Sequence, residues 1–182
     1  MTDASVQRGS WRTDYKYILH FSNTDIIITM NKQITPNLWF DGNAKEAVDF
    51  YISVFPDSKI ISTNYYPNSE KEGLADFQTE LAGKVLTVEF ELSGNRFMAI
   101  NAGPEFKFSE AISFSIDCSD QAEIDYYWDK LSSVKESEQC GWCKDKYGLS
   151  WQVVPKNMEE LMSKPDAFTK LMQMHKIVIA DF

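Results

Sequence analysis

The chain has 182 residues, of which 43% are hydrophobic and 14% aromatic, enough to bury a sizeable core and to argue against intrinsic disorder. Its formal net charge of −9 disfavours nucleic acid and anionic membranes as partners, because both are themselves negatively charged. No apolar run approaches the roughly 18 residues of a membrane helix. An odd number of cysteines and no recognisable export signal predict a cytoplasmic protein in a reducing compartment.

Residues 1–33 form an N-terminal extension whose composition differs from that of the remainder. The segment is polar and patternless up to Asp25, and then residues 26–29 read IIIT, a β-rich run. Two interpretations stay open. Either the segment is a tag or an extended gene prediction with Met30 as the natural start, or it is an extra strand that pairs with the domain or with a partner subunit.

A regular pattern of secondary structure begins at Ile34. Alternation predicts a strand up to Phe40, and an Asn-x-x-Glu capping box at Asn43 and Glu46 predicts the start of a helix. Further strands are predicted over 58–66, 84–92 and 96–101, the last two joined by a hairpin turn at Ser-Gly-Asn. The sequence therefore predicts a β-α-β-β-β module over residues 34–101.

A second module is predicted over residues 111–155, after a connector at 102–110. It has a strand at 111–118, a helix capped by Asp120 and Glu123, and two short strands around the turn at 146–148. At an offset of 76 residues, 48–51 (VDFY) aligns with 124–127 (IDYY) in matching phase, which indicates an internal duplication. We expect one domain over 34–182, in which residues 156–182 add two helices and a closing strand at 175–182.

The quoted patterns resemble a known family. The segments ITPNLWFDGNAKEAVDFYISVFPDSKI, LTVEFELSGNRFMAINAGPEFKFSEAISFSIDC and CGWCKDKYGLSWQVVP are similar to PhnB-like proteins labelled 3-demethylubiquinone-9 3-methyltransferase. These belong to the vicinal oxygen chelate superfamily, with glyoxalase I, the extradiol dioxygenases and the bleomycin-resistance proteins. The resemblance covers residues 33–182. It implies an α+β homodimer with two tandem β-α-β-β-β modules, a curved eight-stranded mixed sheet around a cavity, and the helices outside.

Strand alternation then divides the residues between the two faces of that sheet. We expect seven apolar side chains to pack against the helices: Leu38, Phe40, Met98, Ile100, Ile112, Phe114 and Ile116. We expect the opposite set to line the cavity: Asn37, Trp39, Phe97, Ala99, Asn101, Ser113, Ser115 and Gln152. The metal-ligand positions of the superfamily fall on Asn37, Asn101, Ser113 and Gln152. Because none of these is His or Glu, we expect no metal, and Glu89 and Glu91 match no ligand position.

Other chemistries find little support in the sequence. No two of the eight glycines lie within six residues of each other, so there is no glycine-rich loop for S-adenosylmethionine. Cys140 and Cys143 lie in an extended segment, where residues three apart point to opposite faces, and we interpret them as strand residues. A single reactive cysteine remains an alternative. A hydrolase triad lacks a histidine base within residues 33–174, because the two histidines of the chain are His20, outside the matched region, and His175, on the C-terminal tail.

The leading hypothesis is a metal-free protein without cofactor that binds a small, partly aromatic organic molecule. Trp39 and Phe97 would supply apolar area, and Asn37, Asn101, Ser113 and Gln152 would supply hydrogen bonds. Catalytic residues are unknown. The alternatives are an enzyme, either a metal-dependent lyase or isomerase or the methyltransferase of the label, and a purely structural or interaction subunit.

Overall fold

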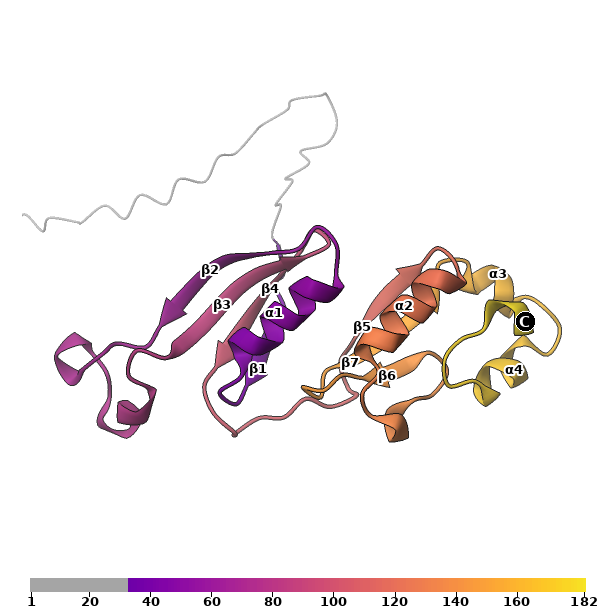
Figure 1. Ribbon diagram of the computed structural model, residues 1–182. Coiled ribbons are helices and arrows are strands. Elements are labelled where there is room, and N and C mark those ends of the chain that lie inside the picture. Colours follow the sequence, from indigo (N-terminus) through magenta and orange to yellow (C-terminus); the bar gives the residue numbers. More distant parts are fainter. Residues whose placement is uncertain (1–32) are drawn as a thin grey trace, which may run out of the picture. The chain divides into compact units, whose positions relative to one another are not determined.

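The structure, a computed structural model, describes residues 33–182, within which Thr35–Phe182 forms one compact unit (Figure 1). The alternatives for residues 1–32, a tag, an extended gene prediction or an extra strand, lie outside the described residues. In residues 33–182, no helix has the length and the apolar character needed to cross a membrane.

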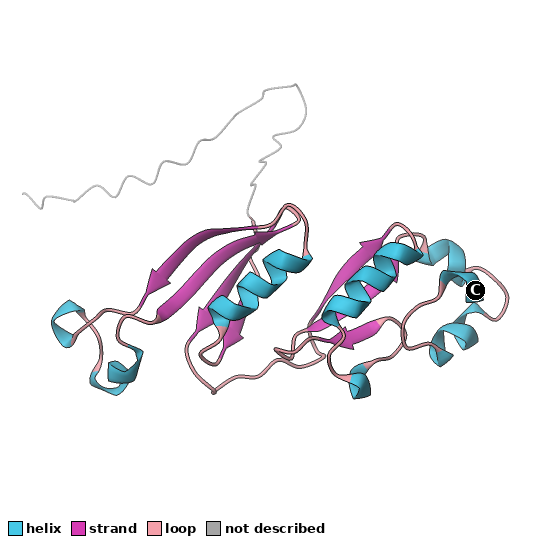
Figure 2. Ribbon diagram, in the orientation of Figure 1, coloured by secondary structure: helices cyan, strands magenta, loops and turns pink. Residues whose placement is uncertain are grey.

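The first sheet, sheet A, has four strands in the order β1-β4-β3-β2. Its strands are β1 (Asn37–Phe40), β2 (Lys59–Tyr65), β3 (Val85–Leu92) and β4 (Asn95–Asn101), and helix α1 (Ala44–Val54) packs against β3 and β4 (Figure 2). Strand β1 pairs with β4 in parallel, whereas the β2–β3 and β3–β4 pairs are antiparallel. Two 3₁₀ turns, Glu70–Glu72 and Asp76–Leu81, interrupt the loop between β2 and β3.

The second sheet, sheet B, has three strands in the order β5-β7-β6. They are β5 (Ser113–Cys118), β6 (Trp142–Lys144) and β7 (Ser150–Pro155), and helix α2 (Gln121–Leu131) packs against them. The pairing repeats that of sheet A, because β5 and β7 are parallel and β6 and β7 are antiparallel. Helices α3 (Met158–Met162) and α4 (Ala167–Gln173) follow, and then a 3₁₀ turn at Ile179–Asp181.

The α+β class is confirmed, while the described strands form two sheets of four and three strands with no closed barrel. A fourth strand of sheet B, matching β2, would fall between α2 and β6. That stretch instead holds a 3₁₀ turn at Lys135–Ser137, and the Ser133 backbone N–H donates to the Lys144 carbonyl at 2.9 Å. Its sequence, SSVKESEQ, has no apolar alternation that would favour a strand.

The predicted closing strand at 175–182 is wrong, because these residues contain only the 3₁₀ turn at Ile179–Asp181. This tail nevertheless contributes to the core, since Ile177 is fully buried. The carbonyls of Met174 and His175 accept the backbone N–H groups of Cys140 and Gly141, each at 2.8 Å. The tail is therefore held along the chain just before β6 without joining the sheet ladder.

Gly141 allows the tail to approach so closely. Its φ is +85°, and a Cβ atom there would lie 2.8 Å from Ile177 Cδ1 and 2.9 Å from the Val153 carbonyl oxygen. Both the positive φ and the missing Cβ are properties that glycine supplies without strain. The backbone at 140–141 can therefore contact the tail and β7 at the same time.

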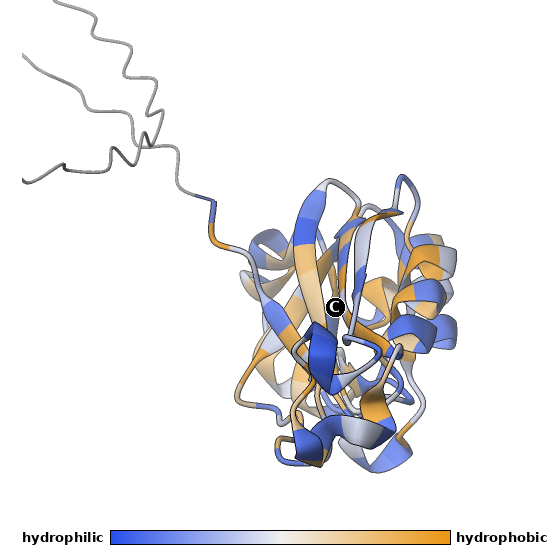
Figure 3. Ribbon diagram, turned by 90° about the vertical axis from the view of Figure 1, so that its left-hand side faces the viewer, coloured by the Kyte–Doolittle hydropathy of each residue, from blue (hydrophilic) through white to orange (hydrophobic). Residues whose placement is uncertain are grey.

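The core is built by the helical spacing that the sequence shows. In α1 the buried stripe is Ala44, Ala47, Val48, Tyr51 and Val54, and in α2 it is Ile124, Trp128 and Leu131. Figure 3 shows hydrophobic and hydrophilic residues interspersed along the same elements, as expected where each has one buried face. Aromatic rings join α1 to sheet B, because the Trp151 ring centroid lies 5.7 Å from Tyr51 and 5.2 Å from Phe55.

Asp145, in the turn between β6 and β7, is a carboxylate buried at the same junction. Its Oδ2 accepts hydrogen bonds from Tyr51 Oη at 2.9 Å and Trp151 Nε1 at 2.8 Å. Its Oδ1 accepts the backbone N–H groups of Tyr147 and Leu149 at 2.8 and 3.1 Å. Burial raises the pKa of Asp145, and the hydrogen bonds act in the opposite direction. The carboxylate thus links α1 to the turn of sheet B.

Candidate functional site

Three predicted site residues lie together on sheet B, on the face turned away from α2, which we call the open face of sheet B. Ser113 and Ser115 come from β5 and Gln152 from β7, and Ser115 is the register partner of Gln152. Gln152 Nε2 donates a hydrogen bond to Ser113 Oγ at 2.8 Å. Two hydroxyls and an amide therefore share one small area, which offers both donors and acceptors to a polar ligand.

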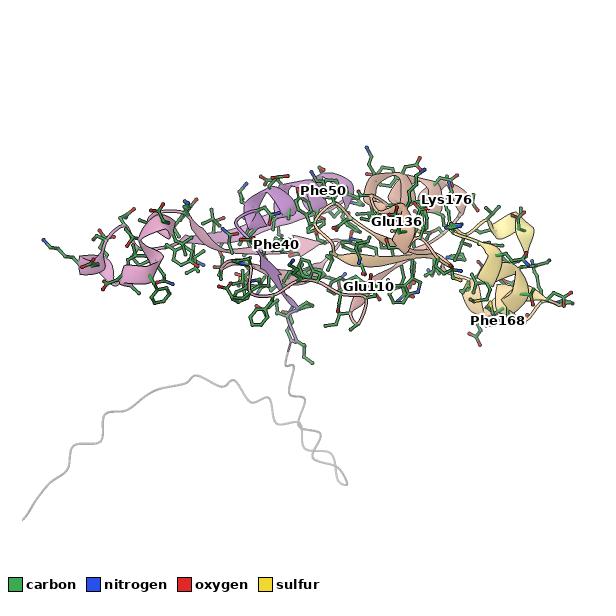
Figure 4. The ribbon with its side chains drawn as sticks, turned by 90° about the horizontal axis from the view of Figure 1, so that it is seen from below. Phe40, Phe50, Glu110, Glu136, Phe168 and Lys176 are labelled. Atoms are coloured by element: carbon green, nitrogen blue, oxygen red, sulfur yellow. The ribbon has the colours of Figure 1, made fainter. Side chains whose placement is uncertain are left out.

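Three residues beside these were not predicted as part of the site: Trp142, Lys144 and Glu110. Strand β6 contributes Trp142 and Lys144, which are the register partners of Gln152 and Ser150. The Lys144 ammonium group forms an ion pair with the carboxylate of Glu110, a residue of the connector before β5. Figure 4 shows Glu110 on the side of the ribbon away from α2. The open face of sheet B therefore combines neutral polar groups, one indole and one cation. Towards the end of β5 it also carries the carboxylate of Asp117, whose Oδ1 accepts a hydrogen bond from Ser115 Oγ at 3.5 Å.

On sheet A, Asn37 and Trp39 lie on the face turned away from α1, the open face of sheet A. Asn37 is exposed, and its Nδ2 donates to the Thr35 carbonyl at 3.0 Å. Trp39 Nε1 donates to the Gly103 carbonyl at 2.8 Å, and its ring packs edge-on against Phe106 at a centroid distance of 4.9 Å. The aromatic partner of Trp39 is thus Phe106 of the connector.

The predicted faces of β4 are reversed. In the parallel register Leu38 pairs with Ala99 and Phe40 with Asn101, so β4 residues 97, 99 and 101 share the helix-facing side. Phe97 is 8% exposed and stacks on Phe90 with centroids 5.5 Å apart. Met98 and Ile100, expected under the helix, lie on the open face. Because residues 97–100 are all apolar, alternation could not fix their phase. Ile112, also expected under a helix, is 69% exposed.

Asn101 has a structural role under α1. Its Oδ1 accepts the Ala44 backbone N–H at 3.3 Å, and its Nδ2 donates to the Val85 carbonyl at 2.9 Å. It thereby satisfies the first turn of α1, where the predicted cap Asn43 makes no side-chain cap hydrogen bond. Glu46, the other half of the predicted capping box, instead accepts a hydrogen bond from Tyr147 Oη at 2.8 Å.

The four positions that match the superfamily's metal ligands do not fit a shared metal ion. Asn101 is buried on the helix side of sheet A, whereas Asn37 lies on the other side, so their side chains cannot converge. Ser113 and Gln152 are hydrogen-bonded to each other and offer neutral oxygens, which are poor ligands for zinc or iron. Within residues 33–182, no three His, Cys, Asp or Glu side chains group closely enough to hold a metal.

The residues also do not fit the methyl donor that the family label implies. Bound S-adenosylmethionine usually needs a glycine-rich turn between a strand and a helix. Here the turn before α1 has the single Gly42, and the first N–H of α1 is taken by Asn101. The turn before α2 has no glycine, and Asp120 Oδ1 accepts the Glu123 N–H at 2.9 Å. Both helix starts are thus occupied by the chain's own side chains.

The thiols of Cys140 and Cys143 lie in different surroundings, and both are free. Cys143 is buried on the helix side of sheet B, and burial raises its pKa to about 12. Cys140 is partly exposed, with its sulfur 3.6 Å from Met172 Sδ. The interpretation of both as strand residues holds for Cys143 of β6, whereas Cys140 lies in the turn before β6 with a φ of +51°. The two thiols thus differ in burial and in neighbours.

Comparisons with known proteins identify the family. The family model described as 3-demethylubiquinone-9 3-methyltransferase matches residues 32–154. A solved PhnB protein from Bacillus cereus, which carries the same methyltransferase label, is 34% identical, with a TM-score of 0.53 over 68% of this chain and 99% of that chain. Protein PA1353 from Pseudomonas aeruginosa is 18% identical, with a TM-score of 0.52 over 69% of this chain and 98% of that chain, which supports the fold alone. Among curated proteins, none matches the chain. The chain therefore belongs to the 3-demethylubiquinone-9 3-methyltransferase family, the PhnB-like group with the vicinal oxygen chelate fold.

Proposed function

We propose that this protein binds a small, partly aromatic organic molecule on the open faces of its two sheets. The observation that supports this most is the grouping of Ser113, Ser115 and Gln152 on one face of sheet B, beside Trp142. Small-molecule sites typically combine aromatic area with a few polar groups that fix orientation. Neutral hydroxyls and an amide can orient a ligand by hydrogen bonds without a metal.

On sheet A, Asn37 and Trp39 are the residues that we propose to take part. The Trp39 N–H is already bonded to the Gly103 carbonyl, so the ligand would contact the indole ring and not its nitrogen. Phe106 is 64% exposed and takes the part first expected of Phe97. Phe97, Ala99 and Asn101 are left out of the proposed site, because they face α1.

The proposal includes the larger assembly that the family resemblance implies: a homodimer in the cytoplasm whose strands form one curved sheet around a cavity. The shared pairing scheme of the two sheets, parallel between first and last strand, supports their origin as tandem modules. The free edges of β1 and β5, each paired on one side only within residues 33–182, leave room for further strand pairing. Native mass spectrometry would give the subunit number directly.

The family label favours one alternative, an S-adenosylmethionine-dependent methyltransferase. That alternative predicts that S-adenosylmethionine raises the melting temperature, because a ligand that binds only the folded state stabilises it. A metal-dependent lyase or isomerase predicts a metal adduct that a chelator removes. The first backbone N–H groups of α1 and α2 already have side-chain partners, and Asn37 and Asn101 lie on opposite faces of sheet A. These two observations support the binding function over the methyltransferase and the metal-dependent enzyme.

The test is native mass spectrometry of gently purified protein, with two matched variants. Gln152→Leu removes an amide from the open face of sheet B, and Gln173→Leu removes one from the exposed surface of α4. We expect a co-purified organic adduct on the wild type and on Gln173→Leu, and its loss from Gln152→Leu. An adduct that Gln152→Leu retains at full occupancy would refute this site.

A further inference from the structure

The open face of sheet B contains a buried hydroxyl without a partner. Ser150, at the start of β7, is 1% exposed, and its Oγ makes no hydrogen bond with any described residue. It is the one such side-chain atom among residues 33–182. Native proteins pair nearly all buried polar atoms, because leaving one unpaired is costly, so an orphan of this kind indicates a missing partner.

The neighbours of Ser150 form a row across all three strands. Ser113 of β5 and Lys144 of β6 are its register partners on either side. Neighbouring strands lie about 4.7–4.9 Å apart, so the two hydroxyls and the ammonium group can reach a common point. Among the residues of β5, β6 and β7, Lys144 is the one cation. The row therefore has donors for an anion and no carboxylate of its own.

The present partner of Lys144 is a replaceable one. Glu110 belongs to the connector, and its side chain is 59% exposed, whereas that of Lys144 is 20% exposed. The hydrogen bond with Lys144 lowers the pKa of Glu110. Because the Glu110 carboxylate is mostly exposed, water can solvate it when it is displaced, so another carboxylate can compete for the ammonium group.

We propose that the ligand of this site is an organic acid whose carboxylate replaces that of Glu110 at Lys144. The displaced Glu110 side chain moves to solvent, and the ligand carboxylate accepts a hydrogen bond from Ser150 Oγ. The next row of the sheet, Ser115, Gln152 and Trp142, receives the remainder of the molecule, with the indole against its apolar part. This inference rests on the proposed function and names the chemical class of the ligand.

The test uses two probes of the same shape, 2-naphthoate and its uncharged amide 2-naphthamide, titrated calorimetrically into the full chain. We expect the wild type to bind the acid at least about tenfold more tightly than the amide, the ratio expected for one charge-assisted hydrogen bond. Lys144→Met should abolish this preference, and Lys144→Arg should retain it. Lys135→Met, which removes an exposed positive charge elsewhere, should leave it unchanged.

Two further variants separate the roles of Ser150 and Glu110. Ser150→Ala should weaken naphthoate binding about five- to tenfold, the effect of one hydrogen bond to a charged group, without lowering the melting temperature. Glu110→Gln should strengthen naphthoate binding, because it removes the competing carboxylate, and should leave naphthamide binding unchanged. Thermal melts of every variant show whether each one is folded.

The outcomes distinguish this inference from the proposed function. Equal affinity for the acid and the amide, with both lost in Gln152→Leu, would keep the binding function and overturn the acidic ligand. Failure of the wild type to bind naphthoate, or Glu110→Gln binding it no better, would overturn the inference as well. In that case the native mass spectrometry described above still tests the binding function, because it does not depend on naphthoate.

Discussion

Asp145→Asn tests whether the buried carboxylate ties α1 to sheet B. The substitution preserves size and leaves one oxygen, which can still accept the two backbone N–H groups of the turn. The new amide nitrogen replaces Oδ2 and meets Tyr51 Oη and Trp151 Nε1. The tyrosine hydroxyl can rotate and accept, but the indole N–H can only donate, so it loses its partner inside the core.

The expected magnitude follows from these contacts. An orphaned buried donor costs about 1–3 kcal/mol, and a hydrogen bond to a charged group contributes about 1.5–3 kcal/mol. We therefore expect Asp145→Asn to lower the free energy of unfolding by about 3 kcal/mol. Tyr51→Phe should lower it by about 2 kcal/mol. The double variant should cost about 1 kcal/mol less than the sum, because each change on its own removes the hydrogen bond from Tyr51 Oη to the charged Oδ2.

The pH dependence has a definite sign. Burial raises the pKa of Asp145 above the value near 3.9 of an unfolded chain, so between the two values the folded state binds more protons. The stability from this group is complete below about pH 4 and is lost as the pH rises through the folded pKa. An asparagine does not titrate, so Asp145→Asn does not lose stability in this way. The difference in free energy of unfolding between the wild type and the variant should therefore decrease as the pH rises.

Urea unfolding at several pH values measures both effects, through midpoints compared at unchanged slope. A cost below about 1 kcal/mol for Asp145→Asn would show that the four hydrogen bonds do not hold this junction. If the stability difference between the wild type and Asp145→Asn does not change between pH 4 and pH 8, burial does not raise the pKa of Asp145.

Three further outcomes are expected from the contacts described. Asn101→Leu should lower the free energy of unfolding by about 2–3 kcal/mol in thermal melts, since the first turn of α1 and a β3 carbonyl lose a partner, and ligand binding should persist. Asp120→Ala should cost about 1 kcal/mol in the same assay, the usual effect of removing a helix cap. With a disulfide-exchange reagent at pH 8, Cys140 should react and Cys143 should not, because burial raises the pKa of Cys143 to about 12. Equal reaction rates for the two thiols, measured by mass spectrometry, would contradict the burial of Cys143.

The sequence was most informative where polar and apolar residues alternate or repeat with a clear period. Both helices follow the 3.6-residue stripe, and the serines of β5 alternate with Phe114 and Ile116, so their faces could be predicted. Strand β4 has four consecutive apolar residues, and only its register with β1 decides which of them face α1. A one-residue error in phase therefore moved Asn101 from the core to the predicted site.

The unpredicted part of the site comes from contacts between distant segments. Strand β6 has three residues, too few for alternation to identify Trp142 and Lys144 as facing the same way as Gln152. Glu110 reaches Lys144 from a connector, and Asn101 reaches the first turn of α1 from the end of β4. A local pattern describes one helix or strand at a time. Contacts between residues that are tens of positions apart can therefore be identified only once the fold is known.

Gly141 has a consequence for mutational tolerance in the Cys-Gly-Trp-Cys segment. Any side chain at this position would collide with Ile177 and the Val153 carbonyl, and would also disfavour the positive φ. Cys140, by contrast, is partly exposed and has no disulfide partner, so serine can replace it for site-specific labelling work. In a library of random substitutions across this segment, the glycine position should be the most depleted of variants that still fold.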